Sequence, residues 1–246
     1  MKNTISRLFF VLILAITAAG CINDAGGRVI SEGVITYNMN YPTDTTLNID
    51  RSLIERNRKS ALVSVFPSSI KLYFKDNNTA MVINGWAGAF SFRYINNYEE
   101  GKIHTLFRVL DKLDYCTDSS SMQFGYREMT DMKISYTQDT MTIAGYLCKK
   151  AVAEGQNIKT DVWYTNNIKI KNANTGNPFK NLDGVPLKFN VLLSGFYMEI
   201  EADHVEMHNK DNKVVPDDIF TVPSDYKSVT EQDLQELLTT FQRRNH

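Results

Sequence analysis

The sequence predicts an α+β fold in which an antiparallel β-sheet carries a few packing helices. Valine, isoleucine, threonine and tyrosine are common and alanine-rich tracts are missing after the first 20 residues, which favours strands. Short apolar runs separated by turn residues follow one another from 69 to 208, the pattern of successive hairpins. The last residues change to a helical period.

The first 20 residues read as a signal peptide. Lys2 and Arg7 precede an apolar run from Leu8 to Ile16, and small residues occupy 18–20. The apolar run is much shorter than the roughly 20 residues that a membrane-spanning helix needs. We therefore expect residues 1–20 to be removed from the mature protein.

The residues around Cys21, Ala-Ala-Gly-Cys, resemble the lipobox of bacterial lipoproteins. The resemblance implies that Cys21 is lipidated and that its acyl chains attach the protein to a membrane, each buried CH₂ contributing about 0.8 kcal/mol. An ordinary cleaved signal is the alternative. We expect residues 21–28 to be the lipidated cysteine and its tether, and 29–246 to be a single β-rich globular domain. Because Ile22 rather than aspartate follows the cysteine, the expected location is the outer membrane of the cell envelope, on either side.

Charge and hydropathy argue against binding of nucleic acid and against direct contact of the polypeptide after Cys21 with a membrane. The formal net charge is −1, without the basic face that binds nucleic acid. No polybasic segment grips anionic lipid, and no apolar stretch after Cys21 reaches spanning length.

Two further cysteines, Cys116 and Cys148, remain in the globular part. In an oxidising envelope they are natural disulfide partners, and two buried free thiols are the alternative. A redox pair is disfavoured because the C-x-x-C spacing is absent.

The elements follow in order along the chain. Residues 33–39 predict a strand, and the S-x-x-E pattern at Ser52 predicts a helix over 52–64. The sequence Asp76-Asn77-Asn78 predicts the turn of a hairpin, because these residue types tolerate left-handed backbone. Another turn is expected at 138–139. The other strand predictions are 70–74, 80–83, 90–95, 102–110, a short strand ending near 116, 134–136, 141–143, 147–153, 160–164, 186–193 and 196–208.

Two segments depart from the strand pattern. Residues 165–183 are rich in asparagine, lysine and glycine and predict a long surface loop. Leu234, Leu237, Leu238 and Phe241 form one apolar stripe at helical spacing, and Thr230 can cap that helix.

Little in the sequence indicates catalysis or a metal. In a strand, His204, Glu206 and His208 would share a face and form a donor set compatible with zinc. The simpler interpretation is a strand that emerges into solvent, so we expect no metal, no cofactor and no catalytic residue. His104 is expected to make a cross-strand polar contact.

Apolar and aromatic residues on several strands allow two interpretations. They either fill an ordinary core or line a cavity for a hydrophobic ligand, since concave apolar sites hold such molecules. The lining residues that we predict are Phe90, Phe92, Leu106, Trp163, Leu192 and Met198.

The second half of the chain resembles a family of bacterial envelope proteins. The segments that carry this resemblance are TIAGYLCKKA at 142–151, VWY at 162–164, LDGVPL at 182–187 and FTVPSDY at 220–226. Their order is similar to that of the GLPGLI-like family, and also resembles the outer-membrane lipoprotein carrier (LolA/LolB-like) superfamily. The resemblance implies a strongly curved antiparallel half-barrel with helices on its concave side, and it implies no activity.

The leading functional hypothesis is therefore a lipid-anchored envelope protein that binds a lipid or another hydrophobic molecule without catalysis. The first alternative is a scaffolding lipoprotein, solid inside, that binds another envelope component through its surface. The second is a metal-dependent hydrolase, which requires His204, Glu206 and His208 to converge.

Overall fold

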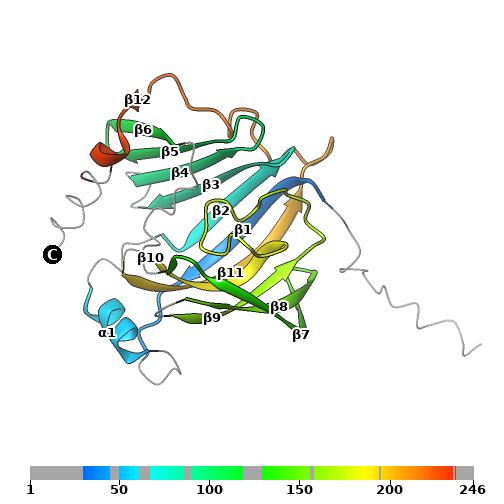
Figure 1. Ribbon diagram of the computed structural model, residues 1–246. Helices are drawn as coiled ribbons and strands as arrows, with labels where there is room; N and C mark the ends of the chain where they lie inside the picture. The colour runs from blue at the N-terminus through cyan, green and yellow to red at the C-terminus, as the bar shows by residue number, and fades with distance from the viewer. Residues whose placement is uncertain are drawn as a thin grey trace, which may run out of the picture.

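The described residues form a single large β-sheet together with the helix α1 (Figure 1). The computed structural model describes residues 30–44, 50–60, 67–85, 90–118, 129–155, 158–193, 195–234 and 236. The elements are β1 (Glu32–Asn40), α1 (Arg51–Lys59), β2 (Ser69–Lys75), β3 (Asn78–Gly85), β4 (Phe90–Asn97), β5 (Lys102–Val109), β6 (Lys112–Asp118), β7 (Lys133–Ile143), β8 (Tyr146–Glu154), β9 (Lys159–Thr165), β10 (Val185–Leu193), β11 (Phe196–Met207) and β12 (Lys227–Ser228).

The strand order is β12-β6-β5-β4-β3-β2-β1-β11-β10-β9-β8-β7. Among these strands only β12 and β6 pair in parallel. The first strand lies in the middle, where β1 pairs with both β2 and β11. It joins an upper run, β2–β6, to a lower run, β7–β11 (Figure 1). The sheet is open, with β12 and β7 at its two edges.

The predicted turn between β2 and β3 is confirmed. Asp76 and Asn77 have φ of 50° and 67°, the left-handed region that these side chains tolerate. The predicted turn at 138–139 is wrong, because β7 runs unbroken through these residues with a register shift between Tyr136 and Thr140. Such a bulge absorbs polar residues without ending the strand.

The predicted helix at 52–64 is confirmed in part. Helix α1 covers Arg51–Lys59, and its N-cap is Asp50 rather than Ser52. The Asp50 carboxylate accepts hydrogen bonds from the backbone N of Ser52 at 2.8 Å and from its hydroxyl at 2.7 Å. These bonds, the side-chain one first, lower the pKa of Asp50.

The predicted fold class, an α+β half-barrel with several packing helices, is wrong. The structure is an open twelve-stranded sheet, and α1 is the one helix named among the described residues. At the predicted C-terminal helix the described residues show a helical turn over 231–234, and Leu237, Leu238 and Phe241 lie outside them. The apolar inner face is covered by the loop between β9 and β10, whose Phe179 and Leu182 belong to the main core, rather than by packed helices.

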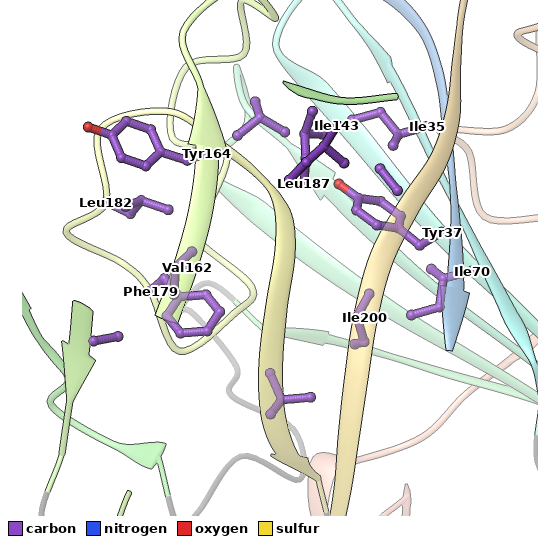
Figure 2. Packing of buried hydrophobic residues seen from close by; sticks show 14 of the residues in the cluster. Ile35, Tyr37, Ile70, Ile143, Val162, Tyr164, Phe179, Leu182, Leu187 and Ile200 are labelled. Atoms are coloured by element: carbon purple, nitrogen blue, oxygen red, sulfur yellow. The ribbon is translucent and has the colours of Figure 1, made fainter. Parts of the chain in front are cut away.

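The main core lies on one face of the sheet, which we call the inner face. It is defined by Ile35, Tyr37 and Ile70 from the central strands and by Ile200 and Val162 from the lower run, all of them buried. Figure 2 shows these side chains converging with Leu187 and Phe179. Burial of this continuous apolar face provides most of the driving force for the fold.

The inner face is covered by the chain itself. Residues 166–184, between β9 and β10, form a loop that we call the plug loop. Its Phe179 is fully buried and packs edge-on against Phe189 at a centroid distance of 5.6 Å. The buried Asn174 donates from Nδ2 to the backbone oxygens of Leu182 and Gly184 at 3.0 and 2.9 Å. The predicted loop is confirmed, but its place on the surface is confirmed only in part, because Asn174 and Phe179 are buried while Lys180 is exposed.

The plug loop also contacts the upper run of strands. Ile168 bridges to Ile30, and the backbone N of Lys171 donates to Oδ1 of Asn77 at 2.9 Å. These bonds satisfy polar backbone that a buried loop would otherwise leave unpaired. The sequence hides this role because the loop's apolar residues are few and its asparagines act inside the fold.

The predicted disulfide between Cys116 and Cys148 is wrong. Both cysteines are buried thiols, and they form no disulfide with each other. They lie on β6 and β8, with strands β5, β4, β3, β2, β1, β11, β10 and β9 between them in the sheet. They also belong to different hydrophobic clusters, which is incompatible with the 4.4–6.8 Å between Cα atoms that a disulfide requires.

Within the described ranges, none of the helical residues forms a stretch long and apolar enough to cross a membrane. The predicted signal peptide, Cys21 and the tether lie outside those ranges.

Candidate binding face

The face of the lower strands opposite the core carries a row of polar side chains around one indole. The register pairs Lys150 with Trp163, Trp163 with Lys188, and Lys188 with Glu201. Glu201 pairs in turn with Asn38 of β1. Since directly paired residues project from the same face, these five side chains form one line across five strands, the outer row.

Alternation within each strand produces the outer row. Along β9, Asp161 is exposed, Val162 is buried and Trp163 is half-buried. Along β1, Met39 is buried between the exposed Asn38 and Asn40. Residues two apart share a face, so a second polar row runs beside the first. Its members are Asp161, Asn190, Glu199 and Asn40.

Charges in the two rows are held in ion pairs. Lys188 Nζ lies 2.7 Å from Oε2 of Glu201, and Lys150 Nζ lies 2.7 Å from Oδ2 of Asp161. The Lys150 ammonium also lies 5.8 Å from the ring centroid of Trp163. Its hydrogen bond to Asp161 raises the pKa of Lys150.

Amide side chains extend the network toward β1. Asn40 Nδ2 donates to Oε2 of Glu199 at 3.2 Å, and Asn38 Nδ2 donates to Oδ1 of Asp203 at 3.4 Å. Each amide keeps a further donor hydrogen and an acceptor oxygen, and each carboxylate keeps several lone pairs. The face therefore presents donors and acceptors in a fixed pattern.

Helix α1 bounds this face at the β10–β11 turn. Arg56 Nη1 donates to the backbone oxygen of Gly195 at 2.9 Å. The buried Asn57 donates from Nδ2 to the backbone oxygens of Tyr197 and Pro42 at 2.8 and 3.0 Å. These bonds fix the helix at one end and leave the two polar rows beyond it.

Such a face is suited to a polyhydroxylated ligand. An indole offers a flat apolar surface with a polar N–H, and carboxylates, amides and ammonium groups bond to hydroxyls from either direction. We call the outer row and the second row together the polar outer face.

The six predicted lining residues for a hydrophobic ligand do not come together. Leu192 and Met198 are buried in the main core, and Trp163 is partly buried and packs against that cluster. Leu106 belongs to a second cluster with Ile95. Phe90 and Phe92 pack against a third, which contains Phe107.

The three predicted metal-site residues do not converge. His204 Nε2 lies 3.3 Å from Glu206 Oε1, and both side chains are exposed on the outer side of β11. His208 contacts other residues. Its Nδ1 accepts a hydrogen bond from the backbone N of Val215 at 3.0 Å, and its Nε2 lies 3.5 Å from Oε1 of Glu32. Among the residues described, no group of three potential ligands is assembled.

The prediction for His104 is confirmed. Its Nδ1 lies 2.8 Å from Oγ1 of Thr117, the residue directly opposite it on β6. Burial lowers the pKa of this imidazole.

The sequence analysis missed the polar outer face, although its signal is present. Polar residues alternate with buried ones at 38–40 and 199–203, and with the partly buried Phe189 at 188–190. Only strand pairing shows that these alternations, together with Trp163, lie on one surface.

Comparison with known proteins supplies two similarities. Residues 117–183 match the family model described as N-glycanase peptide, N-terminal domain. A solved structure of PNGF-II in a C2 space group is 17% identical, with a TM-score of 0.50 over 84% of this chain and 32% of that chain. A second PNGF-II structure, in a P21 space group, is 15% identical, with a TM-score of 0.49 over 84% of this chain and 33% of that one. No curated protein matches the sequence.

The chain spans about a third of the length of these solved chains, because the match covers 32% and 33% of them. At 17% identity the likeness concerns the fold alone. The comparisons do not bear on the GLPGLI-like resemblance, which stays a prediction.

Proposed function

We propose that this chain is a non-catalytic, lipid-anchored envelope protein that binds carbohydrate, of the N-glycan class, on its polar outer face. The observation that carries the proposal is the outer row, in which an indole lies among paired ammonium, carboxylate and amide groups. A sugar ring would stack on Trp163 and exchange hydrogen bonds with Lys188 and Glu201.

The position of the core favours surface binding over binding inside. The inner face is occupied by the plug loop, whose Phe179 is fully buried. The polar outer face lies on the opposite side of the sheet. This arrangement corresponds to the predicted alternative of a solid lipoprotein that binds an envelope component through its surface.

The choice of carbohydrate rests on a second argument. The segment that matches the N-terminal domain of an N-glycanase, 117–183, includes β8 and β9. These strands supply Lys150, Asp161 and Trp163, the aromatic end of the polar outer face. N-glycans are the ligand class that the name of that family suggests.

Attachment through acyl chains on Cys21 is part of the proposal and rests on the lipobox-like sequence. It would hold the binding face near the cell surface or in the periplasm, where glycans and glycoproteins are met. Binding of a hydrophobic ligand stays a prediction without a structural argument in its favour.

The test is calorimetric titration of the detergent-solubilised full chain with an oligosaccharide released from an N-glycoprotein. We expect saturable binding that Trp163→Ala weakens at least tenfold, about 1.4 kcal/mol. Lys188→Met, which breaks the pair with Glu201 and spares the core, should weaken binding as well.

A matched control is available at Tyr98, where Lys171 Nζ lies 5.8 Å from the ring centroid as Lys150 does from Trp163. Tyr98→Ala should leave sugar affinity unchanged. Absence of binding by the unaltered chain, or equal losses from Tyr98→Ala and Trp163→Ala, would refute the proposal.

A further inference from the structure

Two arginines lie together on the outer side of the upper strands. Arg93 of β4 pairs with Leu106, and Arg108 of β5 pairs with Ser91. The two arginines are therefore diagonal neighbours on one face of adjacent strands, a separation that long side chains bridge easily.

A segment from the C-terminal part of the chain covers this region. Val215 and Ile219 join Leu106 in a buried cluster, and Tyr226 packs against that cluster. Tyr226 therefore lies over the face from which Arg93 and Arg108 project. Burial raises the pKa of the Tyr226 hydroxyl, the positive charges of Arg93 and Arg108 lower it, and the nearby carboxylate of Asp225 raises it, as expected when these groups lie near it.

The polar atoms of Arg93 are not all satisfied. Its Nη1 is buried and has no hydrogen-bond partner. Arg93 also takes part in none of the ion pairs that the described residues form with one another. A buried guanidinium nitrogen without an acceptor is costly, so an acceptor oxygen supplied by a ligand would stabilise it.

We propose that Arg93, Arg108 and Tyr226 form a binding site for a tetrahedral oxyanion, a phosphate or sulfate group. Guanidinium forks match the oxygens of such groups with paired hydrogen bonds, and a tyrosine hydroxyl supplies a further donor. Ser91, directly opposite Arg108, is placed to donate as well.

This site is separate from the polar outer face. Strands β3 and β2 lie between β4 and β1, the nearest strand of the polar outer face, a separation on the order of 14 Å along the sheet. Its failure would leave the proposed carbohydrate binding intact, and the reverse also holds.

The experiment titrates the full chain in neutral detergent with inorganic phosphate, at constant ionic strength to hold screening fixed. A parallel titration uses a short-chain phosphatidic acid below its micelle concentration. Arg93→Met and Arg108→Met should each weaken phosphate binding about tenfold or more, and Tyr226→Phe about threefold, in line with charged and neutral donors. Arg93→Lys, which keeps the charge without the fork, should fall between Arg93→Met and the unaltered chain.

The matched control is Arg58→Met, because the Arg58 side chain is 59% exposed on α1 and far from the site in sequence. It should bind phosphate as the unaltered chain does. If the site serves a lipid headgroup, phosphatidic acid will bind more tightly than phosphate and lose its affinity in the same variants. If the anion is free, phosphate will bind at least as tightly. No response to phosphate, or equal affinity in Arg93→Lys, Tyr226→Phe and the unaltered chain, would overturn the site.

Discussion

Gly176 of the plug loop lies flat against the ring of Tyr94 on β4. A Cβ added at residue 176 would come within 2.8 Å of Cζ and 2.9 Å of Oη of that tyrosine. The loop that leaves β9 in the lower run thus reaches the upper run and packs there without space for a methyl group.

Gly176→Ala should therefore destabilise the protein. The added methyl must displace either the buried Tyr94 or the loop, an overpacking cost of about 1–3 kcal/mol. The free energy of unfolding in urea measures it. Lys180→Ala, an exposed change in the same loop, should alter stability by less than about 0.5 kcal/mol. Equal stability of the two variants would show that the loop does not bind the upper strands tightly.

Phe179→Ala tests whether the plug loop is part of the core. Phe179 is fully buried against Phe189, so its truncation should cost about 3–5 kcal/mol. Leu110→Ala removes an apolar side chain that is 69% exposed and should cost little. Chemical denaturation compares them, and a loss below about 1 kcal/mol at Phe179 would contradict the packing described.

The free state of the two buried cysteines gives a chemical prediction. Without reductant, the native chain should react slowly with a thiol reagent because Cys116 and Cys148 are both buried. After unfolding in denaturant, both should react. If neither position yields a reactive thiol when the chain is unfolded, the two cysteines form a disulfide and the structure described is contradicted.

Alkaline pH should destabilise the protein partly through Cys148. Burial raises the pKa of this thiol from 9.0 to about 12, against a smaller opposing hydrogen bond from the backbone of Ile143. The folded state then holds its proton where the unfolded state has lost it, so this contribution is full below about pH 9 and is lost as pH rises from 9 toward 12.

Cys148→Ala isolates that contribution. Burial also raises the pKa of Tyr197 to about 12, and this tyrosine remains in the variant as a shared background. Between pH 8 and about 11 the unaltered chain should lose more stability than Cys148→Ala, measured from urea midpoints. Parallel losses in the two proteins would contradict the burial of the thiol.

The surface pair Lys188–Glu201 separates binding from stability. Both side chains are about half exposed, so Lys188→Met should change the free energy of unfolding by less than about 1 kcal/mol. It should nevertheless weaken oligosaccharide binding. Lys159→Met breaks a comparable exposed pair with Glu154 and should change neither property. A binding loss that matches in both variants would indicate a general charge effect rather than a site.

Local features of the fold are predictable from the sequence, and long-range ones are not. Asp76 and Asn77 specify their turn through their own backbone preferences, and the alternation from Phe196 onward specifies β11. The contact of His104 with Thr117 follows from a short hairpin. By contrast, no local pattern places β1 between β2 and β11, or Phe179 in the core.

The same limit applies to the candidate site. In the sequence Trp163 looks like a core residue because it stands in the apolar run from Val162 to Tyr164. Its partners Lys188, Glu201 and Asn38 come from strands that only the sheet order brings beside it. Charge and aromatic content could be counted in advance, but the face they form depends on register.

The most direct test of the proposed carbohydrate binding is a map of amide chemical-shift changes during titration of the full chain with a released N-glycan. We expect changes concentrated at Lys150, Trp163, Lys188, Glu201 and Asn38. The plug loop and the strands β4–β6 should stay unchanged. Shifts confined to the inner face and plug loop, or no shifts at saturating sugar, would contradict it.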